Sequence, residues 1–275
     1  QVIRINNLSF IKYLLPLVII YSCTDIGKDY SWEERNLESG FSRRYGSVGY
    51  DYGWAGAFSP FDQGLIIIGR QNKKIVGGQS DIWAIKTDSR GLVEWEKTFG
   101  GKADEDGYDV IATSDNGFLF VGYSWSFSNS QQVYVIKTNF HGIIEWEKTF
   151  GGSMWEVGTA AIELTGGGYL ISGFSNSPGL SSGNTDFYLI KINNKGGLIW
   201  EKTYGNKVFP NHEWANDLIQ LPDGGFIVSG SRDRYDKGGK NPLVIRLDPN
   251  GSLIWEKEFK RNDQVDEIIY SISSD

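Results

Sequence analysis

The sequence predicts an all-β fold built from a repeated unit of four strands. The segment Glu94 to Gly101 returns almost unchanged as Glu145 to Gly152, and weaker copies follow at Ile199 to Gly205 and Ile254 to Phe259. The copies are roughly 50 to 55 residues apart, and each interval holds four apolar stretches of strand length separated by turn residues. No apolar stripe with a 3.6-residue period interrupts the series, which disfavours an α/β fold with crossover helices.

Each repeat divides into four expected strands, taken here in chain order. The second unit predicts strands at Asp109 to Thr113, Phe118 to Tyr123, Val133 to Thr138 and Ile143 to Phe150. The third predicts Ala160 to Leu164, Tyr169 to Phe174, Phe187 to Ile192 and Leu198 to Tyr204. The fourth predicts Asn216 to Leu221, Phe226 to Ser231, Leu243 to Leu247 and Leu253 to Phe259. Tight turns rich in Gly, Asn and Asp join the first to the second strand and the third to the fourth.

A period of this length with four antiparallel strands is typical of the blades of a β-propeller, whereas the coils of a β-solenoid are shorter. The ends of the chain fit a ring that closes on itself. Phe41 to Gly46 aligns with Trp95 to Gly100 and predicts a fourth strand without the three before it. Asp266 to Ser273 predicts a first strand without the three after it. We therefore expect a propeller over residues 41–275, with four complete blades, a partial closing blade, a truncated C-terminus and a native ring of five or more blades.

Two segments carry a resemblance to a known repeat family. Asp88 to Trp95 and Asp248 to Trp255 resemble the D-x-x-G-x-x-x-W core of PQQ-like propeller repeats, and their surroundings are similar to uncharacterised repeats of Bacteroidetes lipoproteins. Asn139 and Asn193 replace the Asp of the pattern, and nothing matches the cofactor-binding residues of quinoprotein dehydrogenases. The resemblance implies the fold and the location, and no cofactor is expected.

The N-terminus has the features of an export signal. Arg4 and Lys12 precede the apolar run Tyr13 to Tyr21, which is too short to span a bilayer, so residues 1–22 are predicted to be a signal peptide. Ile20 to Cys23 resembles the lipobox of bacterial lipoproteins, which implies lipidation of Cys23; the alternative is an ordinary buried thiol. Residues 23–40 are polar and predict a tether. The expected location is the outer membrane of the cell envelope, on its periplasmic or its surface side.

Composition limits the partners. The formal net charge of −7 disfavours nucleic acid, because acidic chains repel phosphate backbones. A single cysteine excludes an intrachain disulfide and a cysteine-cluster metal site. We expect a monomer that meets the membrane through its lipid anchor only and that binds a glycan or an envelope protein.

The long connections are predicted to share one face of the propeller, and variable loops on a rigid scaffold are where binding residues tend to lie. The candidate ligand-binding residues on this face combine aromatic planes with acids: Trp125, Phe127, Trp155, Glu156, His212, Glu213 and Trp214. Such a combination suits sugar rings or peptides. The alternative is that the aromatic side chains only fill the loops.

The function expected is non-catalytic binding or scaffolding. The alternative is an envelope glycosidase or polysaccharide lyase that uses loop carboxylates, but no nucleophile motif accompanies His212, so no catalytic residue and no metal ligand is assigned. The repeated Trp95, Trp146, Trp200 and Trp255 predict packing between blades. The Glu-Lys pairs that follow them predict solvated charges on an edge strand.

Overall fold

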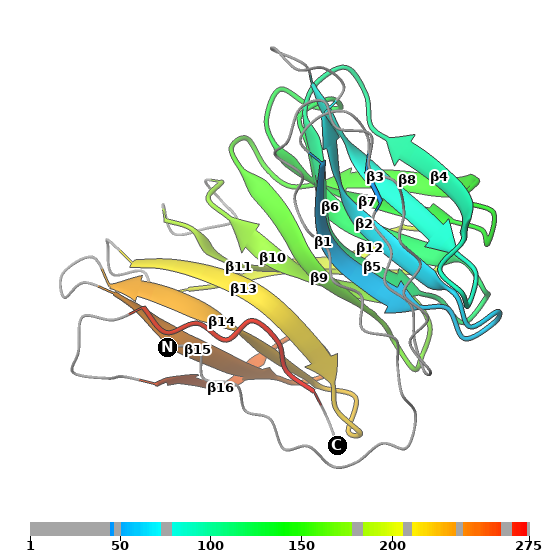
Figure 1. Cartoon of the computed structure of the whole chain (residues 1–275). Helices are drawn as coiled ribbons and strands as arrows, with labels where there is room; N and C mark the ends of the chain where they lie inside the picture. The colour runs from blue at the N-terminus through cyan, green and yellow to red at the C-terminus, as the bar shows by residue number, and fades with distance from the viewer. Residues whose placement is uncertain are drawn as a thin grey trace.

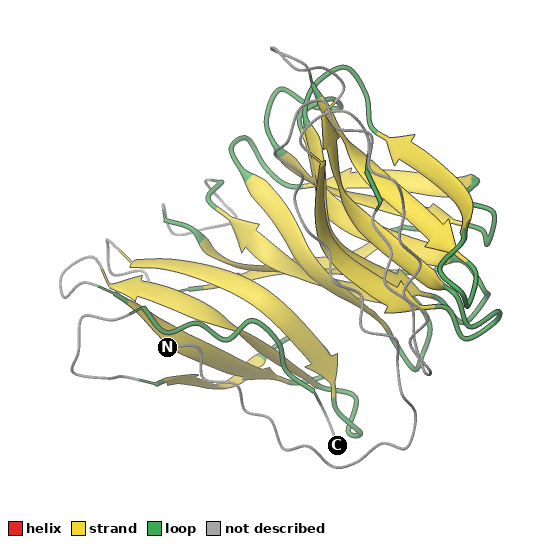
Figure 2. Cartoon of the chain, viewed as in Figure 1, coloured by secondary structure: helices red, strands yellow, loops and turns green. Residues whose placement is uncertain are grey.

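The computed structural model describes residues 45–46, 51–72, 79–177, 184–205, 211–234, 239–259 and 266–273. In this part of the chain, 16 strands form four antiparallel sheets of four strands each, and no residue is helical (Figure 2). The prediction of an all-β chain with repeated four-stranded units is confirmed. None of the four sheets closes on itself.

In every sheet the strands pair in chain order. The first sheet contains β1 (Asp51–Phe58), β2 (Leu65–Asn72), β3 (Ser80–Thr87) and β4 (Val93–Phe99). The second contains β5 (Glu105–Ala112), β6 (Phe118–Ser124), β7 (Gln132–Thr138) and β8 (Ile144–Phe150). The third contains β9 (Glu156–Glu163), β10 (Tyr169–Ser175), β11 (Asp186–Ile192) and β12 (Leu198–Tyr204). The fourth contains β13 (Asn211–Gln220), β14 (Phe226–Arg234), β15 (Lys240–Leu247) and β16 (Leu253–Glu258).

The four sheets lie face to face along an arc. Successive sheets contact one another through their first strands, β1 with β5, β5 with β9 and β9 with β13, which we call the inner strands. Figure 1 shows β1, β9 and β13 toward the middle of the arc and β4 and β16 at its outer edges. Three apolar clusters fill the spaces between neighbouring sheets, and their central side chains, such as Ile68, Val135 and Leu189, are fully buried. The core is therefore made of sheet-to-sheet interfaces.

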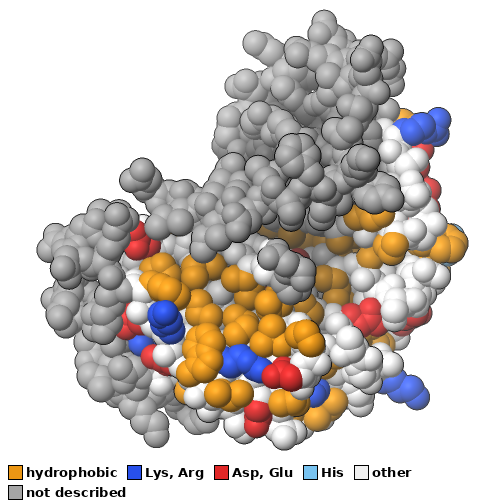
Figure 3. Space-filling view, turned by 90° about the horizontal axis from the view of Figure 1, so that it is seen from below, with side chains coloured by type: hydrophobic (Ala, Val, Ile, Leu, Met, Phe, Trp, Pro, Cys, Tyr) orange, Lys and Arg blue, Asp and Glu red, His pale blue; other side chains and the backbone are white. Residues whose placement is uncertain are grey.

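Three of the four repeated tryptophans, Trp95, Trp146 and Trp200, lie in these interfaces, as predicted. The Nε1 of Trp95 donates to the carbonyl oxygen of Phe140 in the next sheet over 3.0 Å, and Trp146 donates to Asn194 over 3.0 Å. Trp200 is half-buried and packs against the cluster between the third and fourth sheets. Trp255, on the last described sheet, is 44% exposed. Figure 3, which views the molecule from below, shows hydrophobic side chains gathered on the face that is turned toward the viewer.

The described residues near the two ends repeat contacts made inside the arc. The hydroxyl of Tyr45 donates to Gly91 O of the first sheet over 2.8 Å, as the hydroxyl of Tyr204 in the third sheet donates to Gly251 O of the fourth. Glu267 N donates to Lys240 O as Glu213 N donates to Thr185 O. Asp266 to Ser273 therefore contacts the fourth sheet as β13 contacts the third, and Tyr45 contacts the first sheet as Tyr204 contacts the fourth.

The inner strands begin earlier than the sequence predicted. β5, β9 and β13 include residues 105–108, 156–158 and 211–215, which the sequence predicts to belong to the long connections between repeats. Glu156, His212, Glu213 and Trp214 consequently lie on strands rather than on loops, and that part of the prediction is wrong. The physical reason is a β-bulge in each inner strand, which breaks the alternation of apolar and polar residues by which a strand is recognised.

Glu96, Glu147 and Lys148 of the Glu-Lys pairs are exposed, as predicted for solvated charges, and members of the pairs also make hydrogen bonds. Glu96 accepts a hydrogen bond from Trp83 Nε1 over 2.7 Å, and Glu147 accepts one from the hydroxyl of Tyr134. Lys97 Nζ donates to Gly142 O of the next sheet over 2.9 Å. These charges fix the third strand to the fourth, and one sheet to the next.

The signal peptide over residues 1–22, the lipidated Cys23 and the tether over residues 23–40 lie outside the described residues. The described part of the chain contains no helix of the length and hydropathy needed to cross a membrane.

Candidate functional site

A buried glutamate is the first residue of β5 and of β9 and the third residue of β13. Glu105, Glu156 and Glu213 have no exposed surface. Glu156 accepts hydrogen bonds from Gly152 N over 2.9 Å and from the hydroxyls of Ser175 and Ser177. Glu105 accepts from Gly101 N and from Ser124 in the same way. These carboxylates hold the connection between two sheets against the strand that follows it.

The fourth sheet uses an ion pair at the same place. Arg232 takes the position of Ser124 and Ser175, and its Nε donates to Glu213 Oε1 over 2.6 Å. Burial lowers the pKa of Arg232, but its hydrogen bonds to Glu256 and Glu213 outweigh burial and raise the pKa above its ordinary value. Glu156 and Glu213 are fully buried and hydrogen-bonded within the protein, so both have a structural role and neither is open to a ligand.

Three of the aromatic side chains predicted to form the loop face are open to solvent. Trp125, Phe127 and Trp155 are 38%, 49% and 56% exposed. An isolated bridge between Gln131 and Trp155 joins the loop that follows β6 to the loop that precedes β9, so the three residues belong to adjoining loops. We call Trp125, Phe127 and Trp155 the loop aromatics.

Backbone contacts fix the loop aromatics in place. Trp155 N donates to Asn176 Oδ1 over 2.8 Å, and Asn176 N donates to Trp155 O over 3.1 Å. The ring of Phe127 packs on Tyr134 with 5.1 Å between centroids. Rings presented from a rigid frame lose little conformational entropy when they bind.

His212 and Trp214 form a separate group on the fourth sheet. Their rings stack with centroids 5.7 Å apart, and Lys240 Nζ lies 4.5 Å from the centroid of the Trp214 ring. His212 Nδ1 accepts a hydrogen bond from Thr185 N over 3.2 Å, which holds the imidazole to the third sheet. None of the contacts described for this group involves a loop aromatic.

A second cluster of aromatic residues, which the sequence reasoning missed, lies on the first and second sheets. In each inner strand one residue is extra to the pairing: Trp54, Tyr108, Thr159 and Asn216. A glycine of the second strand lies opposite each bulge, and at Gly69 a Cβ atom would come within 1.7 Å of Tyr52 O. Bulges re-aim side chains and are frequent beside functional sites.

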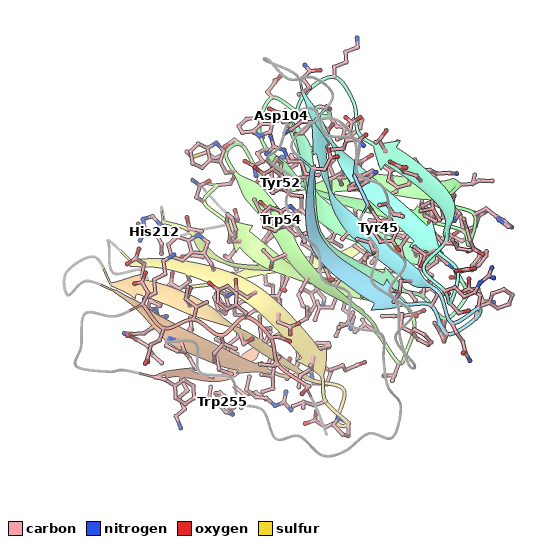
Figure 4. All side chains as sticks on the ribbon, viewed as in Figure 1. Tyr45, Tyr52, Trp54, Asp104, His212 and Trp255 are labelled. Atoms are coloured by element: carbon pink, nitrogen blue, oxygen red, sulfur yellow. The ribbon has the colours of Figure 1, made fainter. Side chains whose placement is uncertain are left out.

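The rings of this cluster form a continuous row. Tyr52 and Trp54 lie nearly parallel, with 5.9 Å between centroids and 11° between planes. Trp54 is 5.7 Å from Tyr108, and Tyr108 is 6.1 Å from Tyr123. In Figure 4 Tyr52 and Trp54 follow one another along β1, with Asp104 above them at the loop end. Trp54 is 50% and Tyr52 37% exposed, so the row has an open surface.

One carboxyl group lies beneath this row. Trp54 Nε1 donates to Asp106 Oδ1 over 2.9 Å, and Arg70 Nη1 lies 4.0 Å from Asp106 Oδ2. Burial raises the pKa of Asp106 to about 6, against the smaller opposing effects of Trp54 and Arg70. Burial, together with the charge of Asp106, raises the pKa of Tyr108 to about 12. We call Tyr52, Trp54, Arg70, Asp106, Tyr108 and Tyr123 the inner cluster.

No group of three or more His, Cys, Asp or Glu side chains in the described ranges could hold a metal ion. The fold and the sites together define an all-β repeat protein with two sets of exposed aromatic side chains.

Comparisons with known proteins find a likeness among solved structures. No family model matches the sequence, and no curated protein matches it either. Among solved structures, the crystal structure of a protein of unknown function from Bacteroides caccae is similar over 79% of this chain and 86% of that chain. The identity is 13% and the TM-score is 0.34.

Proposed function

We propose that the four sheets are consecutive blades of a β-propeller with five or more blades, exported as a lipoprotein of the bacterial outer membrane through Cys23. In this proposal the protein is a non-catalytic binding or scaffolding protein that engages a glycan or an envelope protein through its loop face.

The propeller is supported by the equivalence of the interfaces. Ala161 N donates to Asp109 Oδ2 between the second and third sheets, and Ile272 N donates to Asp217 Oδ2 beyond the fourth, both over 2.8 Å. The same geometry thus recurs at the point where a fifth blade begins. A constant rotation from sheet to sheet carries such an array around a common axis.

The binding function rests on one observation, the exposure of the loop aromatics on adjoining loops. Large aromatic side chains are normally removed from water, and a fixed, exposed group of them is typical of a recognition surface. Their flat faces cover the apolar faces of sugar rings or contact apolar side chains of a protein.

The alternative of an envelope glycosidase or polysaccharide lyase receives no support from Glu156 and Glu213. A glycosidase needs two carboxyl groups that reach the same glycosidic bond. Both of these side chains are fully buried and engaged in hydrogen bonds within the protein.

The test is binding of the full chain to a glycan array and, in parallel, to an envelope extract by cross-linking, with Trp125→Ala and Trp155→Ala combined in one variant. Trp255→Ala is the matched control, because Trp255 is 44% exposed on the outer strand of the fourth sheet. We expect the double variant to lose the bound glycan or the cross-linked protein and the control to keep it. Equal binding by both variants contradicts the proposal.

A further inference from the structure

The inner cluster is built in a way that the fold alone does not require. The third and fourth sheets keep the same bulge with small polar side chains. Thr159 Oγ1 donates to Ala215 O over 2.7 Å, and Asn216 Nδ2 donates to Ile269 O over 2.8 Å, so each ties its inner strand to the next segment. At the equivalent positions, Trp54 and Tyr108 place rings that remain partly in water.

The polar groups of the cluster complement one another. Asp106 is 3% exposed and lies between the indole of Trp54 and the guanidinium of Arg70, whose side chain is 32% exposed. At 4.0 Å, Arg70 Nη1 and Asp106 Oδ2 are too far apart for a direct hydrogen bond. The carboxylate of Asp106 and the guanidinium of Arg70 at this separation suit a ligand group that donates to the first and accepts from the second.

We propose that the inner cluster is a second binding site, distinct from the loop aromatics, and that it takes a pyranose ring of a neutral oligosaccharide. The ring lays an apolar face on Trp54, flanked by Tyr52, and one hydroxyl donates to Asp106 while it accepts from Arg70.

A carbohydrate fits this chemistry better than a peptide does. A sugar hydroxyl is both donor and acceptor, so it satisfies a carboxylate and a guanidinium at once. The apolar C–H face of a pyranose matches an exposed indole. A proline ring also stacks on aromatic side chains, but it brings no donor, which leaves the carboxylate without a hydrogen bond from the ligand.

The experiment uses a microarray of neutral oligosaccharides with a proline-rich peptide as a further probe, followed by titration calorimetry with the glycan that binds best. The variants of the full chain are Trp54→Ala, Trp54→Phe and Asp106→Asn. Trp255→Ala, on the fourth sheet, is the control for the loss of an exposed tryptophan, and Trp155→Ala reports separately on the loop aromatics. Far-ultraviolet circular dichroism and the thermal midpoint of each variant report on folding. Trp54→Phe keeps a ring in place should Trp54→Ala fail to fold.

We expect Trp54→Ala and Asp106→Asn each to weaken glycan binding about tenfold, Trp54→Phe to weaken it less, and Trp255→Ala to leave it unchanged. A glycan whose binding falls with Trp155→Ala but not with the Trp54 variants overturns this inference and leaves the proposed function standing. The opposite result supports the inner site against the loop face. Binding of the peptide alone, or of neither probe, overturns the inner site.

Discussion

Asp106→Asn is expected to change the pH dependence of stability, and the size of the change follows from the structure. Burial raises the pKa of this carboxyl from 3.8 to about 6 in the folded protein, a difference of about 2 units. Each unit corresponds to about 1.4 kcal/mol, so ionisation costs the folded state about 3 kcal/mol relative to the unfolded chain. Asparagine cannot ionise, and its amide oxygen can keep the hydrogen bond from Trp54 Nε1.

The sign follows from which state ionises first. Below pH 3.8 the carboxyl is protonated in both states, and its stabilising effect is complete. As the pH rises from 3.8 to about 6, the unfolded chain ionises first, and the native protein loses that stability. Above pH 6 the loss is constant. The variant lacks this titration, so its free energy of unfolding should rise relative to that of the native sequence by about 2 kcal/mol between pH 4 and pH 7, because the rest of the effect is already present at pH 4.

The assay is urea unfolding of both proteins at several pH values between 4 and 7.5, followed by tryptophan fluorescence. A fixed offset between the two proteins reflects the substitution itself, so the informative quantity is the change of the difference with pH. Asp109, whose pKa burial also raises to about 6, is present in both proteins and cancels from the comparison. Two curves that stay parallel across this range would refute the reasoning.

Three further predictions concern the scaffold and the anchor. Trp146→Ala should lower the free energy of unfolding by about 2 kcal/mol, because Trp146 is half-buried between sheets and its indole donates a hydrogen bond to Asn194. Trp255→Ala should lower it by less than about 1 kcal/mol, because Trp255 is exposed. Equal losses for the two variants in urea unfolding would contradict this prediction. Glu156→Ala should cost about 3 kcal/mol, since three donors lose a charged acceptor in a site without water access, and Glu156→Gln should cost less by the same assay. Cys23→Ala should move the exported protein from the detergent phase to the aqueous phase in detergent partitioning, because the acyl chains expected on Cys23 supply the membrane affinity. An unchanged partition would contradict lipidation.

The outer part of each sheet was predictable from the sequence, and the inner part was not. β12 has the predicted bounds, Leu198–Tyr204, and most second, third and fourth strands agree within one or two residues. These strands are long apolar runs between glycine-rich turns, which is the signal that sequence reasoning uses. The inner strands mix a buried glutamate, a bulge and an aspartate that accepts backbone hydrogen bonds, so half of each was read as loop.

The candidate sites follow the same division. Trp125, Phe127 and Trp155 were predicted from loop variability, and the structure places them on exposed, adjoining loops, while their role in binding stays a prediction. Tyr52 and Trp54 were not predicted, because the bulge at Trp54 breaks the alternation of apolar and polar residues by which a strand is recognised. An aromatic pair two residues apart in a first strand, next to Gly53, was the available signal.

The four repeats can be compared position by position, because each forms the same four-stranded sheet and packs against its neighbours in the same way. Positions on which the copies agree, such as the buried glutamate near the start of β5, β9 and β13, or the glycine opposite each bulge, meet requirements of the fold. The bulged position differs in every sheet, being Trp54, Tyr108, Thr159 and Asn216 in turn. The small polar side chains bond to the next strand, so the backbone needs no ring there. Half-exposed aromatic side chains at a position where the fold accepts threonine therefore point to a requirement outside the fold, and contact with a ligand is the requirement that their chemistry suits.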